Sequence, residues 1–80
     1  EAIRKHRSVK DYKTMLQEVV QRNPGEVVEY VLAGESGPDH DKRFEVEVHL
    51  NSNVIGRGVG RSKKRAEQEA AREALELMGL

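Results

Sequence analysis

Residues 56–66, GRGVGRSKKRA, hold the chain's densest group of side chains that could bind an anion. The segment contains five basic residues and no acidic one, although the whole chain is neutral, with 14 basic and 14 acidic residues. Ser62 is a residue type typical of a helix N-cap, so we expect a helix to begin at Lys63. Cations such as Lys63 and Lys64 are unfavourable at the positive end of a helix dipole unless an anion binds there. The segment therefore indicates a phosphate-binding helix start, with a solvated run of charge as the alternative.

The three alternate glycines of this segment, Gly56, Gly58 and Gly60, do not form a nucleotide-binding motif. The G-x-x-x-x-G-K-[ST] pattern of a P-loop is absent, and the dinucleotide fingerprint G-x-G-x-x-G requires a strand–helix–strand unit that this chain does not supply. A strand with glycine at every second position has one face without side chains, so a neighbouring element can approach its backbone closely. We therefore expect the glycines to be structural.

Catalytic and metal-binding side chains are sparse. The chain has no cysteine, and its histidines, His6, His40 and His49, lie in different predicted elements without the spacing of metal ligands. The carboxylates are spread over both predicted helices and the strands without an inward cluster. The sequence thus predicts no catalytic residue and no cofactor in this chain. His40 falls in a loop rich in Gly and Pro, where its side chain can reach a partner, and His49 is expected to point to solvent.

The length and composition of the chain limit it to one small domain. Its 80 residues, of which 36% are hydrophobic, allow a single compact core. No apolar run approaches the roughly 20 residues of a membrane-spanning helix, so we expect no membrane partner, and nothing indicates a small-molecule ligand. The zero net charge argues against a general binder of polyanions but leaves room for a local basic patch. The absence of cysteine fits a reducing compartment, and we expect a cytoplasmic protein.

An amphipathic helix is expected over residues 9–22. Its start fits either a capping box of Ser8 with Asp11 or Asp11 as the N-cap, and Asn23, Pro24 and Gly25 end it. The face opposite the apolar residues carries mostly neutral hydrogen-bonding groups, where a solvated face would usually carry Lys and Glu. The apolar face comprises Val9, Tyr12, Leu16, Val19 and Val20, and the polar stripe comprises Thr14, Gln17, Glu18 and Gln21.

Three strands and a second helix follow. The strands are predicted at residues 27–33, 43–50 and 54–60, with a loop rich in turn formers at 34–41. Strict apolar–polar alternation in the second strand predicts an antiparallel sheet with one covered face, and in the first strand we expect Tyr30 and Leu32 to point inward. The last helix is predicted over 63–78, with Glu67 at the margin of its packed face. The fold class is therefore α+β, in the order α-β-β-β-α, with both helices packed on one face of a three-stranded antiparallel sheet.

Several segments in this order resemble the double-stranded-RNA-binding domain. They are residues 14–18 (TMLQE), 37–40 (GPDH), 44–48 (FEVEV), 56–66, 70–71 (AA) and 74–75 (AL), so the resemblance covers roughly residues 10–78. The sequences of residues 11–18 (DYKTMLQE) and 63–68 (KKRAEQ) are most similar to the C-terminal domain of bacterial ribonuclease III. Within that resemblance, residues 10–80 form the domain, and residues 1–9 are a linker or the tail of an upstream domain.

The resemblance implies three contacts with duplex RNA. The first helix touches one minor groove, the loop after the first strand touches the next, and the start of the last helix bridges the phosphates between them. Glu67 stands where many family members have a further lysine, which removes one phosphate contact from the general pattern. The RNA-binding residues implied here are Thr14, Gln17, Glu18 and Gln21 in the first region, Pro38 and His40 in the second, and Ser62, Lys63 and Lys64 in the third.

The expected function is binding of double-stranded RNA by shape, with little sequence specificity. The resemblance also implies a parent ribonuclease III, whose magnesium and nuclease activity belong to an upstream domain through which that parent forms a homodimer. This chain by itself is expected to be a monomer. Two alternatives are a domain of this fold used for protein–protein contact, which would lack the RNA-facing residues, and a ribosomal or RNA-processing component of related fold.

Overall fold

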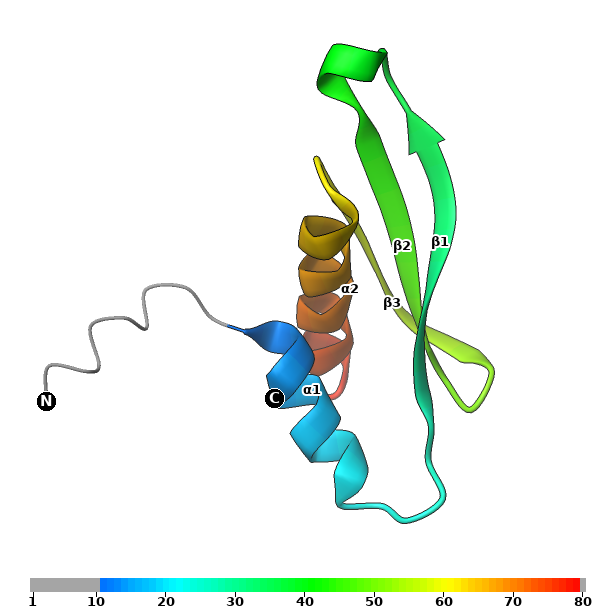
Figure 1. Cartoon of the computed structure of the whole chain (residues 1–80). Coiled ribbons are helices and arrows are strands. Elements are labelled where there is room, and N and C mark those ends of the chain that lie inside the picture. The colour runs from blue at the N-terminus through cyan, green and yellow to red at the C-terminus, as the bar shows by residue number, and fades with distance from the viewer. Residues whose placement is uncertain (1–10, 80) are drawn as a thin grey trace, which may run out of the picture.

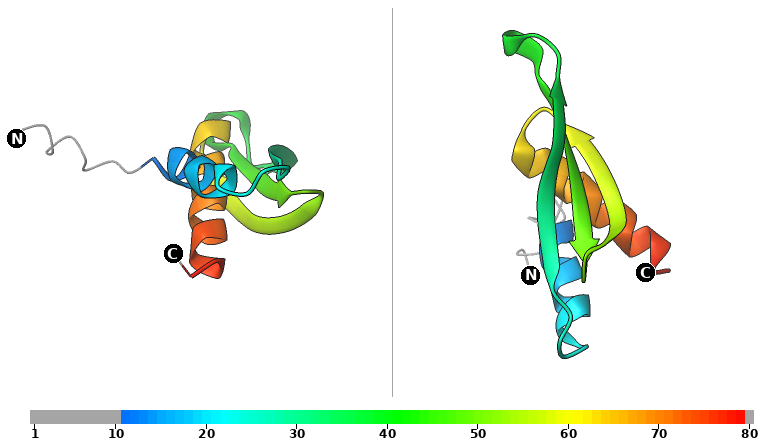
Figure 2. Two further views of the ribbon diagram at one scale, coloured as in Figure 1. Left: turned by 90° about the horizontal axis from the view of Figure 1, so that it is seen from below. Right: turned by 90° about the vertical axis from the view of Figure 1, so that its right-hand side faces the viewer.

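A computed structural model describes residues 11–79 of the chain, and within them the predicted α-β-β-β-α order is confirmed (Figure 1). Three antiparallel strands lie in the order β1-β2-β3, and both helices cover the same face of the sheet (Figure 2). No helix within the described residues is long and apolar enough to cross a membrane. The elements are α1 (Tyr12–Gln21), β1 (Val28–Ser36), the short 3-10 helix η2 (Asp39–Asp41), β2 (Arg43–Leu50), β3 (Asn53–Gly60) and α2 (Lys63–Leu77).

Side-chain caps set the starts of both helices. The Asp11 carboxylate accepts a hydrogen bond from the backbone N–H of Thr14 at 3.1 Å, so Asp11 is the N-cap of α1. Ser8 and Val9, which the sequence analysis placed at the start of this helix, lie outside the described residues, as do His6 and the predicted linker 1–9. Ser62 caps α2 as predicted, because its Oγ accepts from the N–H of Arg65 at 3.1 Å. Both caps satisfy donors that the first helical turn leaves unpaired.

The first strand is longer than the sequence predicts. Residues 34–36 continue β1 instead of starting a loop, because they pair with the first three residues of β2 after a shift in register between Leu32 and Gly34. The pairing supplies hydrogen bonds that override the turn-forming character of these residues. The connection from β1 to β2 is thereby reduced to a tight turn around η2, at the end of a protruding hairpin (Figure 1).

One apolar core fills the space between the sheet and the helices. It combines residues from α1, the middle strand and the inner face of α2, and Tyr30 packs against it as predicted. Leu32 does not: although it pairs with the buried Val46, it is 41% exposed, because β1 is an edge strand with few contacts to either helix. The core residues are Leu16, Val20, Val46, Val48, Ala66, Ala70, Ala71, Ala74 and Leu75.

The outward face of the sheet is less exposed than its alternation predicts. His49, expected to point to solvent, keeps only 23% of its side-chain exposure and lies 3.0 Å from a carboxylate oxygen of Glu47. Glu47 also forms an ion pair with Arg57 of the neighbouring strand at 3.4 Å. Neighbours along β2 and across to β3 thus cover one another on this face, which apolar–polar alternation alone does not show.

The glycines of β3 allow α2 to lie directly on the strand backbone. A Cβ added at Gly56 would lie 2.5 Å from the carbonyl oxygen of Ala70, and one at Gly60 would lie 2.8 Å from the backbone nitrogen of Ala66. A Cβ at Gly58 would overlap the backbone of Ala66 and Ala70 even more closely. The predicted structural task of these glycines is therefore confirmed, and it requires the small alanines on α2.

We expect Gly58→Ala to destabilise the domain by about 2–3 kcal/mol, because rigid backbone surrounds the added methyl group and overpacking of this kind costs roughly that much. Chemical denaturation followed by circular dichroism measures the loss. Gly34→Ala is the matched control, since its nearest atom would be 3.8 Å away and belongs to the flexible Glu45 side chain. Equal effects of the two substitutions would contradict the close packing of α2 on β3.

Candidate nucleic-acid interface

The polar stripe of α1 faces away from the core. All four of its predicted residues are exposed, whereas Leu16 and Val20 on the other side of the helix are buried. Because the buried residues anchor the helix, its outward side chains project from a rigid support rather than from a loop. Their amide and hydroxyl groups can both donate and accept hydrogen bonds. The stripe consists of Thr14, Gln17, Glu18 and Gln21.

The turn between β1 and β2 presents Pro38 and His40 at the end of the hairpin, and both are exposed. Gly37 makes this turn possible: its φ is +90°, and a Cβ there would collide with the carbonyl oxygen of Asp41. The N–H of Asp41 donates to the carbonyl of Pro38 at 2.9 Å, which closes η2 around His40. The sequence therefore holds these two side chains in a compact turn, well beyond the ends of the helices (Figure 1).

The start of α2 carries the third group, Ser62, Lys63 and Lys64, all of which are exposed. The Ser62 hydroxyl is already used as a helix cap. The first turn contains no acidic residue, and neither lysine forms an ion pair with any other described residue. The positive end of the helix dipole and two ammonium groups therefore coincide here, an arrangement that favours a bound anion.

The three groups lie along one edge of the molecule in a definite order. The η2 turn lies at one end, the start of α2 in the middle and α1 at the other end, in both Figure 1 and the right-hand view of Figure 2. A group of cations at a helix start thus lies between two groups of exposed polar side chains. The amino-acid sequence predicted each group, but only the fold arranges the three groups in this spatial order along one edge.

More basic residues surround the start of α2 than the sequence analysis assigned. Arg43, Arg61 and Arg65 line the same hollow as Lys64. Arg43 is distant in sequence, but it begins β2 next to Phe44, which pairs with Gly60 at the end of β3. The signal that could have located it is the antiparallel register, in which the start of β2 must lie beside the end of β3.

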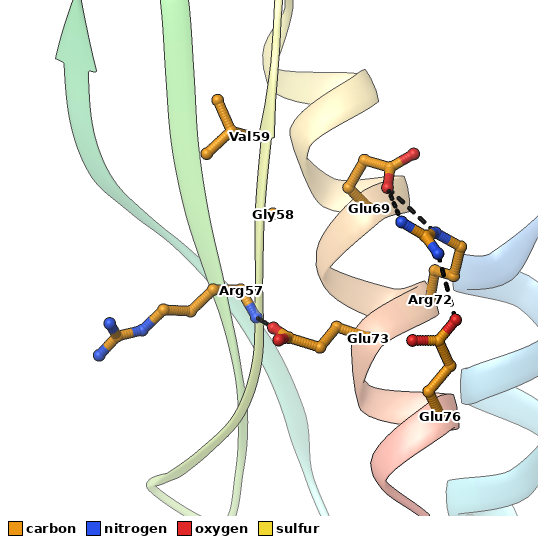
Figure 3. Close-up of a pocket in the computed structure, with 7 residues that line it drawn as sticks. All are labelled: Arg57, Gly58, Val59, Glu69, Arg72, Glu73 and Glu76. Atoms are coloured by element: carbon orange, nitrogen blue, oxygen red, sulfur yellow. Dashed lines mark hydrogen bonds and ion pairs between the residues drawn. The ribbon is translucent and has the colours of Figure 1, made fainter.

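A second hollow, between β3 and α2, has the opposite character (Figure 3). Glu69 and Glu76 hold Arg72 at 2.7 and 3.1 Å, and Glu73 accepts from the backbone N–H of Arg57 at 2.6 Å. Three carboxylates thus surround a single guanidinium, that of Arg72, because the Arg57 side chain extends away from α2 (Figure 3) and pairs with Glu47. Within residues 11–79, opposite charges are therefore separated in space, and Lys63 and Lys64, which form no ion pair with another described residue, lie together at the start of α2.

Contacts from α2 hold the start of α1. The Gln68 carbonyl oxygen accepts from the N–H of Tyr12 at 2.7 Å, and its amide group donates to the carboxylate of Asp11 at 3.0 Å. The hydrogen bond from Gln68, followed by that from Thr14, lowers the pKa of Asp11 to about 2. Glu67 lies at the margin of the packed face, as predicted, where it forms an ion pair with Lys13 at 2.6 Å.

Lys13 also reaches the first strand. Its ammonium nitrogen lies 5.0 Å from the ring centre of Tyr30, within the range of a cation–π contact. Burial, followed by the charges of Glu67 and Asp11, raises the pKa of the Tyr30 hydroxyl to about 12. In the part of the chain that the structure describes, no group of three or more His, Cys, Asp or Glu residues is placed to hold a metal ion.

The fold and this arrangement define a small nucleic-acid-binding domain, and comparison with known families identifies it. Residues 12–78 match the family described as the double-stranded RNA binding motif, and the chain belongs to that family. Among solved structures it is similar to Dicer from Pichia stipitis (TM-score 0.68, 30% identity, 82% of this chain and 32% of that one). It is also similar to the two double-stranded-RNA-binding domains of DRB4 (TM-score 0.57, 30% identity, 84% of this chain and 43% of that one).

Curated relatives confirm the expected resemblance to ribonuclease III. Ribonuclease 3 of Natranaerobius thermophilus is 56% identical over 66 residues, which are 82% of this chain and 29% of that enzyme. Ribonuclease 3 of Pelotomaculum thermopropionicum is 54% identical over 66 residues, 82% of this chain and 27% of that enzyme. The Listeria monocytogenes enzyme is 52% identical over 65 residues, 81% of this chain and 28% of that enzyme. The chain therefore spans less than a third of the length of these relatives.

The lowered pKa of Asp11 predicts how stability depends on acid. Since the folded-state pKa of about 2 lies below the ordinary value of 3.8, the ionised carboxylate stabilises the fold above pH 4, roughly, and this contribution is lost as the pH falls towards about 2. Asp11→Asn keeps an acceptor for Thr14 but removes the charge. We expect the difference in melting temperature between wild type and variant to be constant near neutral pH and to shrink below about pH 4.

Thermal unfolding followed by circular dichroism at several pH values measures this difference. Asp39→Asn is the control, because the Asp39 side chain forms no hydrogen bond with another described residue. A difference for Asp11→Asn that persists unchanged at about pH 2 would mean that the amide's weaker ability to accept hydrogen bonds, not the lost charge, is responsible.

Proposed function

We propose that this domain binds double-stranded RNA by shape, through two successive minor grooves and the phosphates of the major groove between them. The observation that carries the proposal is the order of the three groups along one edge, with the cations of α2 between the α1 stripe and the η2 turn. Duplex RNA offers the same order to a protein: a wide, shallow minor groove, then a phosphate-bordered major groove, then the next minor groove.

The residue types fit the groups they would meet. Thr14, Gln17, Glu18 and Gln21 on one side, and Pro38 with His40 on the other, would contact 2′-hydroxyls and base edges, which both donate and accept hydrogen bonds. Lys63 and Lys64 are compact cations that suit phosphates spanning a groove in which no base is read. The Ser62 hydroxyl accepts the capping bond and can still donate to a phosphate oxygen. Little sequence specificity follows, because most of these contacts address ribose and phosphate.

The two other hypotheses have less support. A member of this family that served protein–protein contact would not need the RNA-facing residues, and here they are present and exposed. A ribosomal or RNA-processing component of related fold would share the basic helix start, but the relatives identified by sequence carry the name Ribonuclease 3. Both hypotheses predict weaker discrimination between RNA and DNA duplexes than we expect.

We further propose that the domain is the substrate-binding part of a ribonuclease III, a nuclease that cleaves duplex RNA. Its magnesium would be held by a nuclease domain outside this chain, through which the whole enzyme would form a homodimer. This chain by itself would be a monomer that needs no cofactor to bind RNA, and residues 1–9 would connect it to the nuclease domain. A cytoplasmic location belongs to the same proposal, because bacterial transcripts are made and processed there.

Comparison of three duplexes tests the proposed function. We expect the domain to bind duplex RNA at least about tenfold more tightly than duplex DNA of the same length, because DNA lacks the 2′-hydroxyls and has B-form groove spacing. An RNA–DNA hybrid should lie between the two. Electrophoretic-shift titration at a single salt concentration measures all three affinities. Equal affinity for RNA and DNA duplexes would refute recognition of the 2′-hydroxyls.

Replacement of both Lys63 and Lys64 by alanine should nearly abolish RNA binding. It should also reduce the slope of log K against log salt by about two, since each lost phosphate contact lowers the slope by roughly 0.9. Arg57→Ala with Arg72→Ala is the matched control, because it removes the same charge from residues whose ion pairs lie elsewhere. An unchanged slope in the lysine variant would show that the helix start makes no phosphate contact.

A further inference from the structure

Two consecutive residues of α2 connect this helix to the start of α1. Glu67 accepts from the Lys13 ammonium at 2.6 Å, and Gln68 bonds both the N–H of Tyr12 and the carboxylate of Asp11. The N–H of Tyr12 is one of the donors that the first turn of a helix leaves unpaired. The start of α1 is therefore completed by a side chain from the other helix, more than 50 residues away in sequence.

The spacing along α2 relates these contacts to the phosphate-binding lysines. Residues four apart lie on the same side of a helix. Glu67 therefore lies one turn C-terminal to Lys63, and Gln68 one turn C-terminal to Lys64. The same side of α2 thus presents cations in its first turn and forms hydrogen bonds with the start of α1 in its second turn. In addition, the carboxylate of Glu67 is engaged by Lys13 rather than by Lys63, which leaves the charge of Lys63 available.

The apolar contacts between the helices do not define their relative position as sharply. Leu16 and Val20 of α1 meet a surface of α2 that is largely alanine, and apolar burial has no directional preference. Hydrogen bonds have short distances and preferred angles. Gln68, bonded to both the N-cap and the first N–H of α1, therefore fixes where α1 begins along α2.

We propose that Gln68 and Glu67 are positioning residues for RNA recognition. They set the distance between the groove-contacting stripe of α1 and the lysines that bind phosphate. This inference rests on the proposed function and deepens it, because it assigns a role to two residues that touch no RNA. The lysine expected from the family at position 67 is then not simply missing; the glutamate here serves the geometry of the site instead of adding a phosphate contact.

Gln68→Ala tests the proposal, because this substitution changes no charge. Loss of the connection lets α1 shift relative to α2, so the 2′-hydroxyl contacts weaken while the phosphate contacts are kept. We expect affinity for duplex RNA to fall about threefold or more, the scale of one hydrogen bond, with DNA affinity and the salt slope unchanged. The ratio of RNA to DNA affinity is the decisive measurement, together with the melting temperature of the free domain.

Glu69→Gln is the matched control. Glu69 is adjacent to Gln68 and bonds Arg72 within α2, so its loss leaves α1 in place and should leave the RNA-to-DNA ratio unaltered. Glu67→Ala should lower that ratio, and Glu67→Gln, which makes the same change in charge but keeps an acceptor for Lys13, should restore most of it.

Three results would overturn the inference. An unaltered ratio in Gln68→Ala would mean that the apolar core alone positions α1. Equal losses for RNA and DNA, accompanied by a large fall in melting temperature, would assign Gln68 a structural role only. If the wild-type domain itself showed no preference for duplex RNA, the proposed function would fail first, and the positioning role would fail with it.

Discussion

The close approach of α2 to the backbone of β3 is the contact on which the rest of the structure depends. It exists because Gly56, Gly58 and Gly60 have no side chains on the face where Ala66, Ala70 and Ala74 lie. Backbone-to-backbone packing leaves little freedom, since a single added methyl group would collide with main-chain atoms. The helix start at Ser62 is therefore held at the end of the sheet. A basic segment that would be a mobile charge run in a loop becomes a fixed group of cations.

That fixed position lets a chain of zero net charge carry a site for an anionic partner. On the side of α2 shown in Figure 3, Glu69 and Glu76 pair with Arg72, and Glu73 accepts from the backbone N–H of Arg57. At its start, Lys63 and Lys64 form no ion pair within the described residues, and Arg43, Arg61 and Arg65 lie around the same hollow as Lys64. Charges of both signs are equal in number, yet the near field that a ligand meets is positive, because fields at short range depend on local geometry.

Much of this was predictable from residues close together in sequence. Helix caps need only a side chain and a donor three residues on, so Ser62 could be identified, and Asp11 was one of two candidates. Alternation in residues 43–50 and the helical spacing of Leu16 and Val20 identify inward faces by period alone. Glycine at every second position of a strand predicts that another element packs closely on its backbone, although it does not identify that element. The family could be identified for the same reason, since its motifs are short local patterns in a fixed order.

The failures come from contacts between distant parts of the chain. Leu32 has the right period to be buried, but it lies on an edge strand with few contacts to the helices and stays exposed. On the outer face of the sheet, Glu47 contacts Arg57 of the neighbouring strand as well as His49 of its own, and only strand register brings Arg57 there. Arg43 joins the cations at α2 through strand register, and Gln68 completes α1 from the other end of the chain. The sequence by itself determined the order of the elements, the inward faces of most of them and the residue types of the candidate interface, because periodicity and capping are local. The tertiary structure alone decided which side chains meet, because that depends on packing between elements far apart in the chain.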